Sequence, residues 1–442
     1  MSTLLQENRK TLFLALPLIA GQLSQMLLGL TDTLMVGRVG TVDLAAAAFG
    51  NALLHLPFSF AIGLSIAVSI QVAHWFGSGQ RASAGEALRN GLIISVLLAV
   101  ALMALVAGSV PLLGYLDPPE EVLAIVPPYL YWIGFSFLAM VPTMVIKSFA
   151  EAQSEPWMVL WIQLGGVLLN IGLNAIFIFG HFGVPAMGLT GAGVATCLAR
   201  FITLGALFYY LLNSRRLAAA LPRVWWCRPD PKECRALTKM ASPLSGQLLI
   251  EIGAFTVSAF LIGQFGAAAL AAHQIALTCA MTTFMLPLGL SMAVTIRVSH
   301  AVSAAQAIRC RRIVMGAQGM GLMIMLSCAL AYVFGGEAIA AGFTEDREVV
   351  GVTVSILAIV AIFQLLDGVQ VISGAALRGM RDVNVPMGIL FACFWLVALP
   401  VGAALGFTAD MGAQGMWSGL AIGLGLASLA LSARLWRKLQ RV

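Results

Sequence analysis

Stretches of about 20 mostly apolar residues, separated by short polar segments, recur along the whole chain. An α-helix of about 20 apolar residues is long enough to cross the hydrocarbon core of a bilayer. Only 10% of the 442 residues are charged, whereas ordinary soluble domains contain about 25%. Such a chain cannot cover a water-facing surface, so we predict an all-α integral membrane protein.

Polar segments and breaks marked by Pro or Gly divide the sequence into twelve predicted transmembrane helices. Their approximate ranges are 12–36, 46–75, 90–114, 125–149, 157–179, 188–212, 237–262, 270–300, 313–334, 349–375, 386–408 and 412–434. The first range continues to Val36 without a clear cleavage site. We therefore interpret it as a retained span rather than a secretory signal peptide.

Positive charges are distributed asymmetrically about these spans. If both termini are cytoplasmic, all but three of the 25 Lys and Arg residues lie on the cytoplasmic side, the exceptions being Arg38, Arg200 and Arg347. This asymmetry follows the positive-inside rule, so we predict a multi-pass membrane protein with both termini in the cytoplasm. The net charge of +6 then reflects this topology and contact with membrane lipids. The sequence lacks the interleaving of basic and aromatic residues that would predict nucleic-acid binding.

The sequence repeats at an offset of 226 residues. Gly37 to His74 aligns with Gly263 to His300 with 14 identities in 38 positions, and Pro17 aligns with Pro243. We predict two pseudo-symmetric six-helix bundles, divided into an N-lobe (1–214), a basic cytoplasmic linker (215–236) and a C-lobe (237–442). Duplication can record ancestry alone. Repeated halves are nevertheless typical of transporters, because rocking one half against the other alternates access to a site between them.

Three acidic residues lie deep within predicted spans: Asp32, Glu251 and Asp367. An ionised carboxylate at the bilayer centre costs about 2.5–3.5 kcal/mol, so each needs a partner, a water-filled cavity or a proton. Arg200, the one basic residue near mid-membrane, could form a structural ion pair with one acid but not with all three. Carboxylates in this setting can exchange protons or, with neutral oxygens, bind Na⁺. We predict H⁺ or Na⁺ as coupling ions and no other cofactor.

Neutral polar side chains accompany the acids. Asn170 and Asn174 lie four residues apart on one predicted helical face, and Thr196 lies in the next span. They can serve as cation ligands, or they can hydrogen-bond between helices and stabilise the bundle. The sequence contains no hydrolase, metalloprotease or nucleotide-binding motif, so we expect a gradient-driven transporter and not an enzyme. Four further side chains are candidates to line a substrate cavity: Gln22, Gln25, His273 and Gln274.

Several short motifs are spread over nearly the whole chain. They are TDTLMVGRVG around Asp32, LNIGLNAIFIFG around Asn170 and Asn174, GAGVAT ending at Thr196, the segment from Gln247 to Glu251, AAHQIA around His273, LLDG at Asp367, and the following ALRGMRD. Together they resemble the multidrug and toxic compound extrusion (MATE) family, particularly its NorM-type bacterial branch.

The resemblance implies roles for individual residues. It implies C-lobe cation- and proton-coupling acids at Glu251 and Asp367, an N-lobe polar cluster of Asp32, Asn170, Asn174 and Thr196, and a hinge at Pro17. Phe363 stands where the resemblance to sodium-coupled relatives leads us to expect a tyrosine ligand. Loss of that hydroxyl weakens the expectation of a C-lobe Na⁺ site and favours proton coupling or an N-lobe Na⁺ site.

The implied function is secondary active efflux of amphiphilic organic cations in exchange for H⁺, Na⁺ or both, by rocking of two lobes in a monomer. The chain's 23 Phe and 20 Met residues suit varied cationic aromatic substrates. The alternative is a lipid-linked oligosaccharide flippase of the same superfamily, which we expect to need a cationic cavity. Three intramembrane acids against the single Arg200 favour the efflux transporter.

Overall fold

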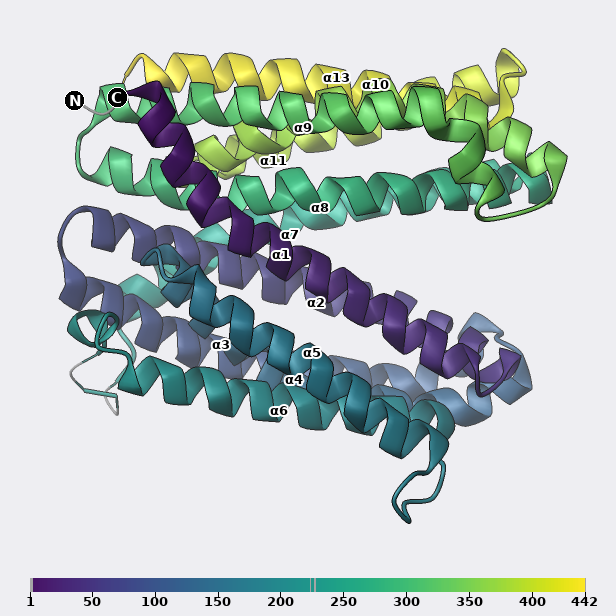
Figure 1. Ribbon diagram of the computed structural model, residues 1–442, viewed down its shortest axis with the longest axis horizontal. Coiled ribbons are helices and arrows are strands. Elements are labelled where there is room, and N and C mark those ends of the chain that lie inside the picture. The colour runs from purple at the N-terminus through teal and green to yellow at the C-terminus, as the bar shows by residue number, and fades with distance from the viewer. Residues whose placement is uncertain (1–2, 223, 226–227, 442) are drawn as a thin grey trace. The chain divides into compact units, whose positions relative to one another are not determined.

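The computed structural model describes residues 3–222, 224–225 and 228–441, and within these it contains helices and no strand. Twelve helical segments are long and apolar enough to cross a membrane, which confirms the predicted all-α fold with twelve spans (Figure 1). The first six helices are α1 (Leu4–Gly37), α2 (Thr41–Gly77), α3 (Arg81–Ser109), α4 (Glu120–Ala152), α5 (Pro156–Phe179) and α6 (Gly188–Asn213). The others are α7 (Pro231–Gly263), α8 (Ala267–Ser303), α9 (Ala307–Ala341), α10 (Arg347–Gly379), α11 (Asn384–Phe391), α12 (Leu399–Ala403) and α13 (Gly412–Leu439).

The helices extend beyond the apolar runs that predicted them. The first begins at Leu4 and not near residue 12, and α7 begins at Pro231, inside the predicted linker 215–236. An apolar run marks only the part of a helix that lies in hydrocarbon, whereas the helix itself continues into the polar interface. Proline suits a helix start because the first N–H groups have no partner within the helix. Residues 223, 226 and 227 of the linker lie outside the described residues.

The chain forms two compact units. Unit 1 comprises the residues up to Gln22 together with those from Gly246 onward, and unit 2 runs from Leu23 to Ser245. These units differ from the predicted sequence-order lobes at the first helix of each repeat. Helices α1 and α7 each begin in one unit and end in the other.

The beginnings of α1 and α7 are held by equivalent contacts, 226 residues apart. In unit 2, Gln71 Nε2 on α2 donates a hydrogen bond of 2.6 Å to Glu233 Oε1 on α7. In unit 1, Arg297 on α8 forms a buried ion pair with Glu7 on α1. Glu7 and Glu233 are repeat mates, as are Gln71 and Arg297. The first helix of each repeat therefore packs against the second helix of the other repeat.

Close backbone packing follows the same symmetry. Gly63 on α2 lies against the backbone of Ser245, where a Cβ on the glycine would overlap it. Its repeat mate Gly289 on α8 lies in the same way against the backbone of Ile19, which is the repeat mate of Ser245. Glycine at both positions lets the two helices approach more closely than any other residue would permit.

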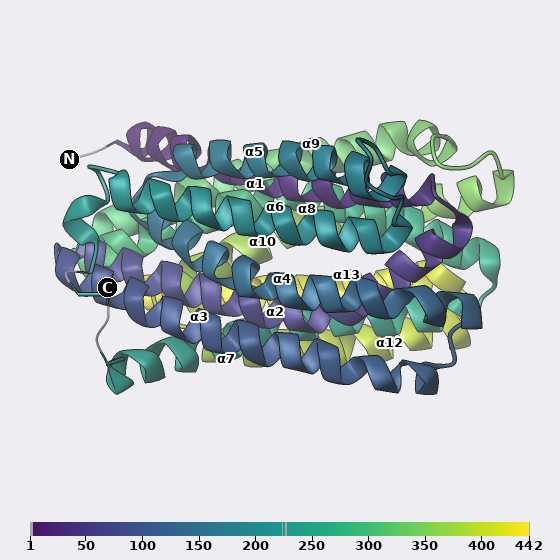
Figure 2. The same cartoon turned by 90° about the horizontal axis from the view of Figure 1, so that it is seen from below.

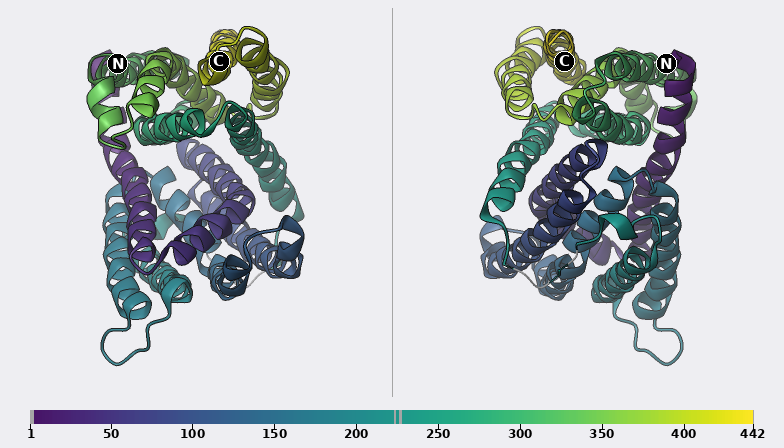
Figure 3. Two further views of the ribbon diagram at one scale, coloured as in Figure 1. Left: turned by 90° about the vertical axis from the view of Figure 1, so that its right-hand side faces the viewer. Right: turned by 90° about the vertical axis from the view of Figure 1, so that its left-hand side faces the viewer.

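Within unit 2, α2 and α3 both pack along α4, which also packs against α6, and α5 lies against α6 (Figure 2). The chain between α5 and α6 projects beyond the ends of these two helices (Figure 3). At the start of α6, the backbone N–H of Leu189 donates to Asp43 Oδ1 of α2 at 2.9 Å. This contact satisfies one of the unpaired donors of a helix N-terminus and fixes α6 against α2.

The eleventh span in unit 1 is not one regular helix. Between α11 and α12 the chain forms π-helical turns over Ala392–Ala398, and a second π-helical stretch follows at Ala404–Thr408. Pro400 lies between these stretches and has no N–H to donate, so the regular hydrogen-bond ladder is interrupted there. Gly419 of α13 packs directly on the backbone at Gly402, which holds α13 beside this irregular span (Figure 3).

Replacing Gly289 with Val is expected to lower the free energy of unfolding by about 1–3 kcal/mol, because the new side chain would overlap the backbone of Ile19. Gly351→Val on α10 is the matched control, since no atom lies within 4 Å of a Cβ placed there. Thermal unfolding of the detergent-purified protein measures the effect. Equal unfolding midpoints for the two variants would contradict the packing described.

Candidate cation-binding sites

A chain of hydrogen bonds joins four polar side chains of unit 2. Asn174 Nδ2 on α5 donates to Asp32 Oδ1 on α1 at 2.5 Å and to Asn170 Oδ1 at 3.0 Å. Asn170 Nδ2 then donates to Thr196 Oγ1 on α6 at 3.3 Å. The two asparagines face the same way because they lie one helical turn apart. The structure thus brings together all four members of the predicted N-lobe cluster.

The oxygens of this cluster are suited to a hard cation. Asn170, Asn174 and Thr196 are buried, and Asn174 Oδ1 has no hydrogen-bond partner among the described residues. A buried acceptor without a partner is unfavourable unless a donor or a cation reaches it. Carboxylate, amide and hydroxyl oxygens are the ligands that hard cations prefer. No group of three or more His, Cys, Asp or Glu in the described part of the chain could hold a metal ion.

Arg200 on α6 does not pair with any of the intramembrane acids. Its Nη1 donates to Ser136 Oγ on α4 at 2.6 Å, and its guanidinium lies 5.6 Å from the centre of the Phe58 ring. Among the described residues, no ion pair includes Arg200. A hydroxyl and an aromatic face therefore hold the Arg200 guanidinium, and no salt bridge joins it to Asp32.

The two C-lobe acids lie on facing helices of unit 1. Gln370 Nε2 on α10 donates to Glu251 Oε1 on α7 at 3.2 Å. Asp367 lies three residues before Gln370 and hence on the same face of α10, where it is 7% exposed. No ion pair among the described residues includes either acid. Sequence reasoning missed Gln370, although a polar residue one turn from an intramembrane acid was the available signal.

An aromatic wall adjoins the acid pair. Phe363 precedes Asp367 by one turn of α10, is buried, and packs edge-on against Phe255 and Trp417 with ring centres 6.1 and 5.9 Å apart. The ring at Phe363 therefore presents carbon where the resemblance led us to expect a hydroxyl. Besides the two carboxylates, the amide of Gln370 supplies an oxygen-bearing side chain at this pair.

The predicted hinge lies in the part of α1 that belongs to unit 1. Pro17 is buried, and α1 is continuous through it. Asp32 is 15 residues further along the chain, about 22 Å along the helix, and belongs to unit 2. The hinge role stays a prediction.

The four cavity candidates differ in how far they are buried. Gln22 is half-buried and Gln25 is exposed on α1. Gln274 is exposed on α8, whereas its neighbour His273 is fully buried and packs against Trp417 with ring centres 5.6 Å apart. His273 therefore belongs to the interior of unit 1 and does not share a surface with Gln274.

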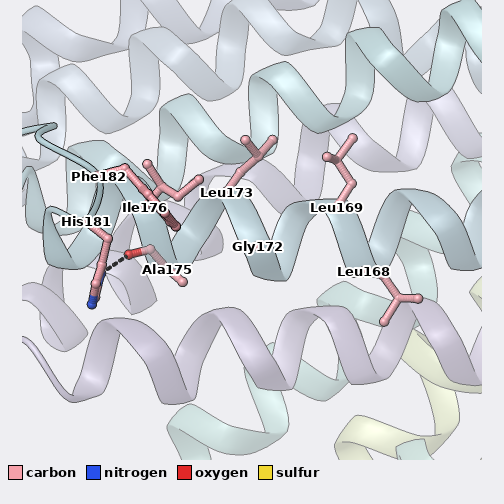
Figure 4. A pocket seen from close by; sticks show the side chains of 8 residues that line it. All are labelled: Leu168, Leu169, Gly172, Leu173, Ala175, Ile176, His181 and Phe182. Atoms are coloured by element: carbon pink, nitrogen blue, oxygen red, sulfur yellow. Dashed lines mark hydrogen bonds between the residues drawn. The ribbon is translucent and has the colours of Figure 1, made fainter.

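A separate pocket of about 540 Å³ runs along α5 in unit 2 (Figure 4). Its lining is apolar apart from His181, whose Nδ1 lies 2.8 Å from the carbonyl oxygen of Ala175. None of the predicted site residues lines it. The pocket is formed by Leu168, Leu169, Gly172, Leu173, Ala175, Ile176, His181 and Phe182. It contains no acid that could balance a cationic substrate.

Sequence comparison identifies relatives over nearly the full length. The family model MatE matches residues 17–176 and 243–404, and the two matches start at the repeat mates Pro17 and Pro243. The multidrug resistance protein NorM of Photobacterium profundum is 32% identical over 442 residues, which cover 97% of this chain and 95% of that protein. NorM of Vibrio cholerae is 32% identical over 441 residues, which cover 98% of this chain and 95% of that protein.

Solved structures share the fold. The Vibrio cholerae MATE transporter VcmN in its bent form superposes with a TM-score of 0.91 at 21% identity, covering 100% of this chain and 99% of that one. The eukaryotic MATE transporter AtDTX14 gives a TM-score of 0.90 at 18% identity, with coverage of 100% and 98%. A transporter of the MOP superfamily from Pyrococcus furiosus, described as having a binding pocket of reverse polarity, gives a TM-score of 0.90 at 19% identity. The match covers 98% of this chain and 96% of that one.

Proposed function

The chain belongs to the MatE family, and on that premise we propose that it is a secondary active multidrug efflux antiporter of the bacterial inner membrane. Its substrates are amphiphilic organic cations, which it exchanges for H⁺, Na⁺ or both. This assignment agrees with the names of the NorM relatives, which are transporters and not enzymes.

One observation carries the proposal. Asp32, Glu251 and Asp367 lie in membrane-spanning helices, and no ion pair among the described residues neutralises any of them. A carboxylate in this position needs a proton, a metal cation or a cationic ligand. A protein that takes up each of these in turn can exchange one for another, which is the chemistry of a cation antiporter.

The two sites divide the coupling. The Glu251–Asp367 pair, with Phe363 in place of a hydroxyl ligand, offers few oxygens for Na⁺ and suits proton exchange. The cluster of Asp32 with Asn170, Asn174 and Thr196 supplies carboxylate, amide and hydroxyl oxygens, which suit Na⁺ or a proton. Their repeat mates are not acidic, so each unit contributes a different kind of site.

The orientation follows from charge. Arg309 at the start of α9 lies 3.5 Å from Glu7 Oε2, and Arg311 donates to the carbonyl oxygen of Leu439 at 2.9 Å. The first and last helices therefore start and finish at the same end of unit 1 (Figure 1). Because Lys and Arg collect at this end, we place both termini in the cytoplasm. The working form is a monomer in contact with anionic lipids, whose two lobes rock to alternate access.

Reconstitution tests the function. Proteoliposomes containing the full chain and a fluorescent organic cation are given a proton gradient alone or a Na⁺ gradient alone. We expect concentrative dye transport with at least one of these gradients and its loss when an ionophore dissipates that gradient. Dye transport that is independent of both gradients overturns the proposal. Movement of lipid-linked oligosaccharide without dye transport would favour the flippase.

A further inference from the structure

Unit 1 contains a second group of buried polar atoms apart from the acid pair. It consists of His273 on α8, Ser258 on α7 and Trp417 on α13, all three fully buried. Both ring nitrogens of His273, the hydroxyl of Ser258 and Nε1 of Trp417 have no hydrogen-bond partner among the described residues. Buried polar groups are almost always hydrogen-bonded, so four orphaned atoms in one unit call for an occupant.

The three side chains lie at a similar depth along their helices, near the α7–α8 end of unit 1. Ser258 lies five residues before the end of α7 and His273 six residues after the start of α8, about 8 Å and about 9 Å along their helices. The His273 ring packs against Trp417 at 5.6 Å. Phe255, one turn before Ser258 on the same face of α7, packs against the same tryptophan at 6.4 Å.

The group lies next to the acid pair along α10. Trp417 packs against Phe363, and Asp367 follows Phe363 by one turn. In the proposed orientation the α7–α8 turn faces the outside of the cell. Trp417 and its neighbours therefore lie between that side and the acids. Ser258 is also the repeat mate of Asp32. The first helix of each repeat, α1 or α7, therefore has a polar side chain at the same position near its end.

The hydrogen-bonding atoms fit water better than a cation or an apolar ligand. Indole N–H only donates, a neutral imidazole has one donor and one acceptor, and a hydroxyl does both. Buried water makes two to four such bonds with otherwise unpaired groups. None of the three side chains is a carboxylate, so a bound cation would lack a counter-charge. An apolar ligand would leave all four atoms unpaired.

We propose that His273, Ser258 and Trp417 hold buried water, and that this water carries protons between the α7–α8 end of unit 1 and the Glu251–Asp367 pair. The proton-carrying role rests on the proposed function, whereas the presence of water does not. Water accepts a proton on one side and donates one on the other, so no bond other than O–H or N–H changes.

Hydroxyl-radical footprinting of the purified full chain tests for the water directly, because radicals formed from buried water label the side chains beside it. Phe363 borders the group and is 5% exposed, whereas Phe149 in unit 2 is 0% exposed and serves as a control of the same residue type. We expect Phe363 to be labelled several-fold faster than Phe149. Equal labelling of the two residues overturns the proposal.

Three substitutions then test the proton route. Trp417→Phe removes only the N–H, Ser258→Ala only the hydroxyl, and His273→Leu the whole imidazole. Each is expected to reduce labelling of Phe363 and to slow proton-driven dye export, with at least a tenfold loss for His273→Leu. Thr256→Ala is the matched control, because Thr256 is exposed and bonds only within α7.

The outcomes separate this inference from the proposed function. Wild-type export rates in all three variants, with reduced labelling of Phe363, would overturn the proton route. Loss of export in His273→Leu, with an unchanged export rate in Trp417→Phe and Ser258→Ala, would also contradict the proton route. A packing defect caused by the leucine would then be enough to explain the loss. If the Glu251→Gln and Asp367→Asn variants still export dye, the proposed function fails. The footprinting result for buried water does not depend on that outcome.

Discussion

Glu251→Gln and Asp367→Asn are each expected to reduce ion-driven dye export to the level of protein-free liposomes. Each substitution keeps the shape of the side chain but removes the carboxylate that we propose takes up the coupling ion. The variants should still insert and fold, because a neutral amide is easier to bury in hydrocarbon than a carboxylate. Gln370 Nε2, which donates to Glu251 Oε1 at 3.2 Å, can also donate to the new amide oxygen.

Transport in proteoliposomes under an imposed gradient measures this effect, and size-exclusion chromatography verifies folding. Glu348→Gln is the control, since Glu348 is exposed at the start of α10 and lies outside the candidate sites. Full export by both acid variants would show that these carboxylates do not couple transport to the ion gradient.

Glu7→Ala is expected to lower the free energy of unfolding by about 3–5 kcal/mol, because it leaves the buried guanidinium of Arg297 without its carboxylate. In the ion pair, Glu7 is 1% exposed and Arg297 is 6% exposed. Arg309, 3.5 Å from the same carboxylate, loses a partner as well. The midpoint of thermal unfolding in detergent is expected to fall accordingly.

Arg297→Gln provides the informative comparison. It creates the combination of glutamate and glutamine that the other repeat already has at Glu233 and Gln71. It also leaves Arg309 beside Glu7. We therefore expect a smaller loss, about 1–3 kcal/mol, from the hydrogen bonds that the arginine made to Thr11 and the Glu7 carbonyl. A greater loss in Arg297→Gln than in Glu7→Ala would contradict this account of the contact.

The parts of the structure that sequence predicted are those governed by local pattern. Apolar runs of sufficient length marked all twelve spans, because crossing a membrane imposes the same requirement on every one of them. The N-lobe cluster was also predictable. Asn170 and Asn174 share a helical face by spacing alone, and a polar face in hydrocarbon must meet another polar group, which proved to be Asp32.

Other features depend on information that one sequence does not contain. The repeat relates Glu7 to Glu233 and Arg297 to Gln71, but the same pattern would arise whether each glutamate met the second helix of its own repeat or that of the other. Only the three-dimensional packing distinguishes these cases. The burial of His273 beside an exposed Gln274 likewise depends on which neighbours cover each face of α8.

The exchange of first helices has a consequence for each six-helix half taken alone. A single six-helix chain built on this plan would leave the start of its first helix without its packing partner, because that partner belongs to the other repeat. Two copies could supply the missing packing partner only by exchanging the start of this helix, as domain-swapped dimers do. A six-helix chain built on this plan would therefore complete its packing as an intertwined homodimer. In such a homodimer, the glutamate that corresponds to both Glu7 and Glu233 would contact the second helix of the other subunit.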